Sequence, residues 1–548
     1  MYNSAVDSIL KDSIKSAIYI DEKAWEPYTE QPNTGDLEVE YSQQIYQRFK
    51  DMGISVAVRA FQSGDVSNQS QRNYFFEKRD LVLLDWKLAG DTGEEHALKL
   101  LSDLVKRPHI HFCSIYTSEP DVYSVFDNIL AYFSGLCETD YDIIKLDITH
   151  IEEQLQSLFP IIKNLSYNRF NKQFVRDTIR ELFSTQRELL KEVKEIINDN
   201  DLSCSLIKAM YALDKSLIKS DEPQSKPTLV AIDQKLIVIN NTIITILNKE
   251  ETAPESIIND FKNHIVGSRD SFVSMLGLEM QNIITQTNSL IDANDIGITR
   301  NALIAHRKQL TEGIPSELST ILYDETIKKI LIQNIDLKLK YSSFKLLEKD
   351  VLDFIELESN APTSSELTSL NVFYNSISIK NKKRIDFGDV FKKDEDYYLC
   401  INALCDCLRP EKNKWQFFFV KGKPIDIEDA LRLGDTAFIS FINNNLIVNW
   451  VPLEKHAQGN NDKEDIQILK GFKYKPAYIK PEQYLIESPD IADGKIKLWK
   501  AIQAKKDNLD IEETEIEYVT TIKENYTQRI ANHAFTYPVR VGVDFVGH

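Results

Sequence analysis

Acidic side chains stand directly after two short apolar stretches in the N-terminal part of the chain. The stretch SAIYI runs into Asp21 and Glu22, and the stretch LVLL runs into Asp85. Two further apolar stretches end in the hydroxyl of Thr117 and in the ammonium of Lys145. If these stretches are parallel strands of one sheet, their carboxyl ends meet at one edge, where such sheets bind ligands. The pattern predicts carboxylates, a hydroxyl and an ammonium at one place.

This set of side chains is suited to phosphoryl transfer. Neighbouring carboxylates repel one another, and a hard divalent cation relieves the repulsion; oxygen ligands with room for water suit Mg²⁺. A phosphoryl group beside the cation would place one oxygen on Mg²⁺, one on Lys145 and one on Thr117. A carboxylate can itself be the nucleophile and form an acyl phosphate. Positioning and electrostatic stabilisation would then supply most of the catalysis.

The strands that would position these residues are short and nearly all apolar, as strands covered by helices on both faces are. Helical stretches lie between them; the one at 93–107 places its leucines on one face. Strand–helix alternation predicts a doubly wound parallel sheet of five strands over residues 1–155, with a loop inserted at 26–40. The expected strands are SAIYI (16–20), ISVAV (54–58), LVLL (81–84), HFCSIY (111–116) and DIIKL (142–146).

Four segments of this region resemble the receiver domain of response regulators in two-component signalling. They are SAIYIDE, DLVLLDWKLAGDTGEEHALKLLSDL, HFCSIYTSEP and YDIIKLD, and the resemblance covers about residues 10–155. It implies a sensor histidine kinase as the partner and Mg²⁺ as the cofactor. The roles that it implies are phosphoacceptor for Asp85, switch hydroxyl for Thr117, phosphate-binding lysine for Lys145, and metal ligands for Asp21, Glu22, Asp85 and the backbone carbonyl of Lys87.

The sequence departs from the family pattern beside Lys145. Leu146 stands where the family usually has a proline, and Asp142 stands where an aromatic residue commonly precedes the lysine by three positions. We therefore expect an altered switch between the hydroxyl and the aromatic side chain. A receiver that keeps these residues but is never phosphorylated is the alternative interpretation.

The remainder of the chain shows two other sequence patterns. Residues 156–365 show long helical patterns, at 174–199, 229–249 and 325–356, which predict an all-α bundle or connector. Residues 366–548 contain short aromatic and β-branched segments, which predict a β-rich α+β domain, with a barrel as one arrangement. Later in that domain, EQYLIE and KIKLWKAIQAKK are expected to be helical, and residues 525–545 are expected to form a closing helix and tail.

Composition excludes several classes of protein. The 548 residues exceed one hydrophobic core, so several domains are expected. A formal net charge of -19 argues against non-specific nucleic-acid binding. There is no secretory signal, and no apolar run reaches the roughly 18 residues of a membrane span. Six cysteines in so long a chain do not make a disulfide framework, so we expect a cytoplasmic protein with reduced thiols.

Two further motifs favour structural interpretations. The sequence DFGD (386–389) looks like a kinase metal motif, but no glycine-rich or catalytic loop accompanies it. Cys400, Cys405 and Cys407 lack the second ligand pair of a zinc site, so buried small side chains are the preferred interpretation.

Two functions remain open for the chain as a whole. In the first, it is a signalling module without enzyme activity beyond phosphorylation and dephosphorylation of Asp85, and its helical region forms a homodimer. The overall layout resembles the effector-less receiver protein of bacterial anti-phage systems of the Detocs type. That resemblance implies a phosphate sink for the kinase and a second receiver protein that carries the effector. In the second, the C-terminal region is an unrecognised enzyme switched by the receiver.

Overall fold

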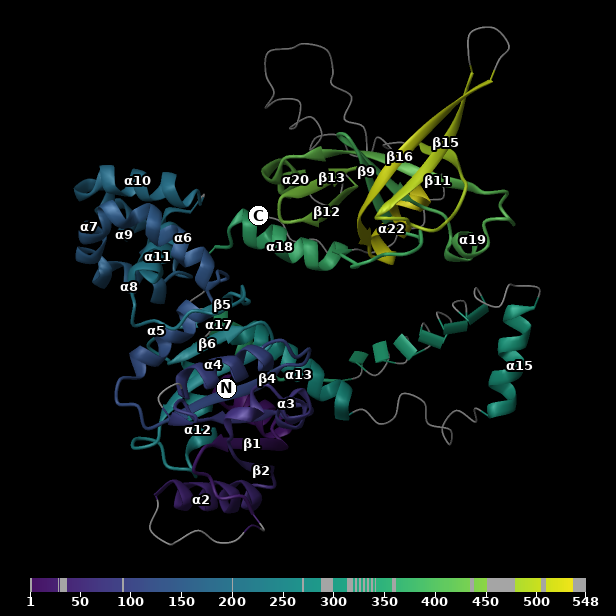
Figure 1. The fold of residues 1–548 in the computed structure, drawn as a ribbon. Helices are drawn as coiled ribbons and strands as arrows, with labels where there is room; N and C mark the ends of the chain where they lie inside the picture. The colour runs from purple at the N-terminus through teal and green to yellow at the C-terminus, as the bar shows by residue number, and fades with distance from the viewer. Residues whose placement is uncertain are drawn as a thin grey trace. The chain divides into compact units, whose positions relative to one another are not determined.

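The computed structural model divides the chain into two compact units, whose elements are labelled in Figure 1. Unit 1 comprises Met1–Gly297 and Ile330–Glu358, and unit 2 comprises Ile298–Lys329 and Ser359–His548. The structure describes residues 2–27, 29, 37–90, 93–199, 201–268, 271–286, 299–312, six two-residue pieces between 319 and 340, and residues 342–356, 361–433, 438–450, 479–503 and 509–535. None of the helices in these ranges has the length and apolar composition of a bilayer span.

A seven-stranded sheet forms the centre of unit 1, in the order β2-β1-β3-β4-β7-β6-β5. Five strands are parallel: β1 (Ser16–Asp21), β2 (Ser55–Ala60), β3 (Leu81–Leu84), β4 (His111–Thr117) and β7 (Thr242–Asn248). β5 (Pro227–Ala231) and β6 (Leu236–Ile239) extend the sheet beyond β7 in antiparallel fashion. Every residue of β3, β4 and β7 is buried, as expected for strands covered on both faces. The predicted doubly wound parallel sheet is confirmed.

Helices cover both faces of this sheet. Successive residues of a strand point to opposite faces, and they enter two different apolar clusters. On β1, Ile18 and Ile20 enter one cluster, and Tyr19 enters the other. The helices of the first cluster include α3 (Gln69–Phe76), α4 (Gly93–Leu104) and α5 (Val122–Tyr132). Those of the second are α1 (Tyr2–Ser13), α2 (Leu37–Asp51), α12 (Ile257–Gly267), α13 (Phe272–Gln286) and α17 (Lys349–Glu356).

Six helices are inserted between α5 and β5 and pack on the first cluster. The last of them, α11 (Leu202–Leu213), is buried along most of its length and contacts each of the others. The inserted helices therefore pack around α11, which lies at the centre of this group of helices. The other helices of this group are α6 (Glu138–Ile148), α7 (Glu152–Ser157), α8 (Phe159–Tyr167), α9 (Lys172–Thr185) and α10 (Arg187–Ile197). The helical stretch predicted at 174–199 forms two helices, α9 and α10, which are separated at Gln186.

The strand predicted at residues 142–146 is wrong, because this stretch lies within α6. The Asp140 carboxylate accepts a hydrogen bond from the backbone N–H of Cys137 at 3.0 Å and so caps the helix start. Tyr141 and Ile148, seven residues apart, are the buried positions of the helix. This spacing is helical, although the short run DIIKL also fits a strand.

The helix predicted at residues 229–249 is also wrong, because this stretch forms β5, β6 and β7. Five of the first seven residues after the turn at Asn240 and Asn241 are β-branched, and such residues favour strands. Asn240 has a φ of 49°, a conformation that asparagine adopts more readily than most residues. The sheet of unit 1 therefore continues far beyond the boundary expected at residue 155, into the region expected to be all-helical.

His111, at the start of β4, is buried and should make the stability of unit 1 depend on pH. Its ring contacts the His109 carbonyl at 2.7 Å and the Thr242 hydroxyl at 3.0 Å, and burial lowers the pKa of His111 to about 4. Below pH 6.5 the unfolded chain binds a proton that the folded chain does not. We expect this group to lower the free energy of unfolding by about 3 kcal/mol as the pH falls from 6.5 to 4, with no loss above that window.

Urea unfolding of the wild type and of His111→Asn across this pH range measures the effect. The variant should show a shallower acid loss of stability. Equal pH slopes for the two proteins would show that His111 is not its source.

Unit 2 contains a closed barrel of six strands, in the order β10-β9-β16-β15-β14-β11 and back to β10. Figure 1 labels four of these strands, β9, β11, β15 and β16. The strands are β9 (Asp389–Lys393), β10 (Asp396–Cys400), β11 (Gln416–Ile425), β14 (Pro481–Ile486), β15 (Lys495–Gln503) and β16 (Leu509–Ile522). β13 (Leu446–Asn449) and β12 (Ile439–Asn443) continue the sheet from β11, and β8 (Ser376–Ile377) pairs with β16. The helices of this unit include α15 (Arg300–Thr311), α18 (Ser364–Asn375), α19 (Leu404–Leu408), α20 (Ile427–Leu433) and α22 (Glu524–Ala534).

The barrel confirms the β-rich prediction for the C-terminal region and corrects two details of it. EQYLI of the segment EQYLIE lies in β14 and KIKLWKAIQ forms β15, so the helices predicted there are wrong. The nine residues of β15 pair with β16 along their whole length, and this long-range pairing outweighs local helix propensity. The closing helix is confirmed as α22, whereas the tail from residue 536 onward lies outside the described residues.

Candidate functional site

Four parallel strands of unit 1 end in polar side chains at one edge of the sheet. Asp21 is the last residue of β1, and Thr117 is the last residue of β4. Asp85 follows β3 directly, and its backbone N–H donates to the Ile20 carbonyl at 2.9 Å. Lys249 follows β7 directly, and its backbone N–H donates to the Thr117 carbonyl at 2.8 Å. This is the edge at which doubly wound sheets bind their ligands.

The ammonium of Lys249 joins two of the predicted acids. Its Nζ lies 2.7 Å from Oδ2 of Asp21 and 2.8 Å from Oδ1 of Asp85. The exposed fractions of the three side chains are 2% for Lys249, 3% for Asp21 and 10% for Asp85. One positive and two negative groups are therefore enclosed together, and we refer to Asp21, Lys249 and Asp85 as the charged triad.

Mutual attraction keeps Asp21 and Lys249 ionised despite their burial. Burial alone would raise the pKa of Asp21, but the charge of Lys249 and hydrogen bonds to the carboxylate hold this pKa below its usual value. Burial likewise opposes the charge of Lys249, but Asp85 and Asp21 raise the pKa of its ammonium well above the ordinary range. Lys249 thus carries a full positive charge at neutral pH.

Two tyrosines enclose the triad from the α1–α2 side of the sheet. The Tyr19 hydroxyl donates to Oδ2 of Asp21 at 2.7 Å. The Nζ of Lys249 lies 5.9 Å from the ring centroids of both Tyr19 and Tyr116, within the range of a cation–π interaction. The Tyr116 hydroxyl donates elsewhere, to the Thr252 carbonyl at 2.8 Å.

The loops that follow β3 and β4 hold Asp85 and Thr117 in place. The backbone N–H of Lys87 donates to Oδ2 of Asp85 at 3.0 Å. The Lys87 ammonium pairs with the Glu119 carboxylate at 2.6 Å, which ties the two loops together. The Thr117 hydroxyl accepts a hydrogen bond from the backbone N–H of Glu119 at 3.1 Å. In this contact the Thr117 hydroxyl is the acceptor, so the bond does not use its proton.

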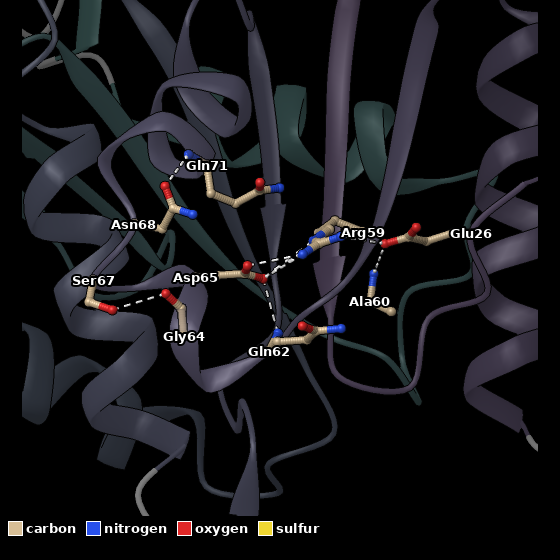
Figure 2. A network of polar contacts seen from close by, with 9 residues as sticks. All are labelled: Glu26, Arg59, Ala60, Gln62, Gly64, Asp65, Ser67, Asn68 and Gln71. Carbon is tan, nitrogen blue, oxygen red and sulfur yellow. Dashed lines mark hydrogen bonds and ion pairs between the residues drawn. The ribbon is translucent and has the colours of Figure 1, made fainter.

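A second polar network fixes the neighbouring loops of this edge (Figure 2). Arg59 of β2 contacts both oxygens of Asp65, at 2.9 and 3.2 Å from Nη2, and its Nη1 lies 3.1 Å from Oε1 of Glu26. The Asp65 carboxylate also accepts from the Gln62 backbone, and the Glu26 carboxylate accepts from the Ala60 backbone, each at 3.0 Å. The loop after β1 is thus anchored to the end of β2.

The structure brings together most of the predicted site residues but replaces the lysine. Glu22 lies in the turn after β1, next to Asp21, and is partly exposed. Lys145 lies in α6 of the inserted helices, so the prediction that it ends the fifth parallel strand is wrong. Lys249 occupies that position at the end of β7.

Among the described residues, the predicted metal ligands form no compact cluster by themselves. In the part of the chain that the structure describes, no group of three or more histidine, cysteine, aspartate or glutamate residues has the spacing of a metal site. Asp21 and Asp85 offer hard oxygen donors, and both already tolerate a cation between them, the ammonium of Lys249. Donors of this kind fit Mg²⁺ when water supplies the remaining ligands.

The fold is a doubly wound α/β domain with a buried charged triad at the carboxyl edge of its sheet. A family model described as the response receiver domain matches residues 13–165. The chain therefore contains a response receiver domain, a type of domain that typically binds Mg²⁺ at its phosphorylation site. No curated protein and no solved structure matches the chain. The matched residues include Asp21, Asp85 and Thr117 and end before Lys249, whose place in the triad comes from the structure alone.

Proposed function

We propose that Asp85 accepts a phosphoryl group from the phosphohistidine of a sensor histidine kinase. The observation that carries this proposal is the charged triad at the carboxyl edge of a receiver-domain sheet. Burying three charged groups is unfavourable unless they pair well, and such clusters are concentrated at functional sites. Asp85 is the most exposed member of the triad, which suits it to meet an incoming donor.

In the proposed step, a carboxylate oxygen of Asp85 attacks the phosphorus of phosphohistidine. The new O–P bond forms as the P–N bond breaks, and the electrons of the broken bond return to the imidazole nitrogen, which is protonated. Lys249, 2.8 Å from Oδ1 of Asp85, stabilises charge on a phosphoryl oxygen. The hydroxyl of Thr117, at the end of the neighbouring strand β4, donates to another oxygen.

The proposed cofactor is Mg²⁺, held by Asp21, Glu22, Asp85 and the backbone carbonyl of Lys87. The chemistry of these donors supports the assignment, since all are hard oxygens. When bound, Mg²⁺ would neutralise charge on the phosphoryl oxygens.

Acetyl phosphate, a small phosphoryl donor, tests the proposal without a cognate kinase. The full chain is incubated with acetyl phosphate and Mg²⁺, and its intact mass is measured. We expect the mass of one phosphoryl group per chain, absent from Asp85→Asn and from samples treated with a chelator. Failure of the wild type to form an adduct, or an equal adduct on Asp85→Asn, would overturn the proposal.

We further propose that unit 2 binds a partner and that the whole chain is a signalling module or phosphate sink. Its support is the layout, a receiver domain joined to a barrel whose strands contribute alternate residues to two apolar clusters, one on each face of the barrel wall. The Detocs-type anti-phage setting, with a second receiver protein as effector, is part of this proposal. A sink predicts that Asp85→Ala makes the kinase pathway hyperactive. Toxicity of Asp85→Glu on expression would instead support a phosphorylation-switched effector.

A further inference from the structure

The Asp21 carboxylate is almost fully occupied by hydrogen-bond donors. Its Oδ2 accepts from the Tyr19 hydroxyl and from the Lys249 ammonium, each at 2.7 Å. Its Oδ1 accepts from the backbone N–H of Lys23 at 2.8 Å. A carboxylate has about four lone-pair positions. Among the contacts of the described residues, three are taken, and the position that remains for a metal ion is on Oδ1.

The Tyr19 hydroxyl and a bound metal ion would both draw on the negative charge of the Asp21 carboxylate. A phenol that donates to a carboxylate forms a charge-assisted hydrogen bond and withdraws electron density from both oxygens. A carboxylate that has given up charge in this way is a weaker ligand for a hard cation. Asp21 would remain aligned without Tyr19, because Lys249 and the backbone of Lys23 still hold it.

We propose that the hydrogen bond from the Tyr19 hydroxyl draws charge from the Asp21 carboxylate and thereby lowers the Mg²⁺ affinity of the site. This inference rests on the proposed function, since it concerns the same metal ligand. With the Tyr19 hydroxyl present, a higher Mg²⁺ concentration is needed to fill the site than with the carboxylates alone. Phosphorylation of Asp85 would then depend on Mg²⁺ concentration over a higher range.

The surroundings of Tyr19 allow its hydroxyl to be removed by itself. Tyr19 is fully buried in β1, and its ring packs edge-on against the ring of Tyr116, with centroids 6.4 Å apart. Phenylalanine fills the same space and keeps the aromatic face toward Lys249. Tyr19→Phe therefore changes one donor without opening a cavity.

Tyr116 provides a matched control in the same pocket. Its ring is also buried and also lies 5.9 Å from the Nζ of Lys249, but its hydroxyl donates to the Thr252 carbonyl and not to Asp21. Tyr116→Phe thus removes an equally buried hydroxyl beside the same ammonium. Any general effect of losing a phenol in this pocket will appear in both variants.

Calorimetric titration of the full chain with MgCl₂ tests the inference. We expect Tyr19→Phe to bind Mg²⁺ about fivefold tighter than the wild type, and Tyr116→Phe to stay within about twofold. With acetyl phosphate, the half-saturating Mg²⁺ concentration for phosphorylation should fall by the same factor in Tyr19→Phe, while the rate at saturating Mg²⁺ changes by less than about twofold.

The outcomes separate this inference from the proposed function. If Tyr19→Phe binds Mg²⁺ no more tightly than the wild type, or matches Tyr116→Phe, the role of Tyr19 is overturned and the metal site stands. If the wild type binds no Mg²⁺ at all, the proposed metal site fails, and the role of Tyr19 fails with it.

Discussion

Lys249→Met is expected to slow phosphorylation of Asp85 by acetyl phosphate about 100-fold or more, because it removes a preorganised cation from the transition state. Lys249 is the buried ammonium that contacts Asp85 at 2.8 Å, and methionine keeps most of its length without the charge. The rate of adduct formation, followed by intact mass at saturating Mg²⁺, measures the effect.

The same substitution should also destabilise unit 1. It leaves the carboxylates of Asp21 and Asp85 buried without their shared counter-ion, which costs about 3 kcal/mol in comparable cases. Urea unfolding measures the loss, and added Mg²⁺ should recover part of it if the metal binds these carboxylates.

Lys145→Met is the matched control, because Lys145 is the lysine that the sequence pattern selects and α6 is where the structure places it. It should leave both the phosphorylation rate and the stability nearly unchanged. A large rate loss in Lys145→Met with none in Lys249→Met would contradict the structure of this site.

Gly388→Ala is expected to destabilise the barrel of unit 2 by about 3 kcal/mol or more, through steric overlap and backbone strain. Gly388 has a φ of 90°, and a Cβ atom there would lie 2.4 Å from the backbone oxygen of Ile522. The Ile522 oxygen cannot move away from this Cβ unless β16 also moves. Such a movement would disturb the pairing of β16 with β9. Thermal unfolding followed by near-ultraviolet circular dichroism would show the loss.

Gly494→Ala separates the two contributions. Gly494 also has a positive φ, of 79°, but a Cβ atom there would have no neighbour within 4 Å. It should cost only about 1 kcal/mol, the penalty for a left-handed backbone. Equal losses in the two variants would show that the close approach of Ile522 contributes nothing.

The surroundings of Gly388 also explain the DFGD motif in structural terms. The carboxylate of Asp389 is buried and accepts hydrogen bonds from the Asp386 backbone at 2.7 Å and from the Thr521 hydroxyl at 2.6 Å. Lys382 pairs with it at 3.1 Å. These contacts join the start of β9 to β16, which gives Asp389 of the motif a role in the packing of the barrel.

Much of the receiver domain could be predicted from sequence because its signals are local. Asp21 and Asp85 stand at the ends of short, continuously apolar strands, and the structure places both in the triad. Thr117 follows the same rule at the end of β4. Each of these residues is the last residue of its strand or directly follows it. Their place at the sheet edge can therefore be predicted without knowledge of contacts between distant parts of the chain.

The lysine could not be found in this way, because the fifth strand is displaced along the chain by the inserted helices. YDIIKLD offers a lysine at the expected interval after β4, and its short apolar run fits a strand, but the structure packs it as a helix against α11. The run TIITILN before Lys249 is rich in β-branched residues and follows an Asn-Asn turn, which is a strand signal. Its pairing with β4, more than a hundred positions earlier in the sequence, is a long-range contact that local periodicity does not contain.

The helix predictions for EQYLIE and KIKLWKAIQ in unit 2 are wrong for a related reason, because strand pairing is also a long-range contact. The nine residues of β15 include three lysines, one alanine and one glutamine, which suit a helix, and their strand conformation depends on pairing with β16. Tyr19 was missed as a site residue because its hydroxyl reaches Asp21 from inside a strand that reads as purely apolar.

Chemical trapping of the phosphorylated residue tests the central proposal most directly. Borohydride reduces an aspartyl phosphate to homoserine, so peptide mapping after treatment with acetyl phosphate and Mg²⁺ identifies the modified aspartate. Our account predicts conversion at Asp85 and at no other aspartate, with loss of the signal when Lys249 is replaced. Trapping at another residue, or a chain that remains unmodified while its Mg²⁺ site is filled, would contradict it.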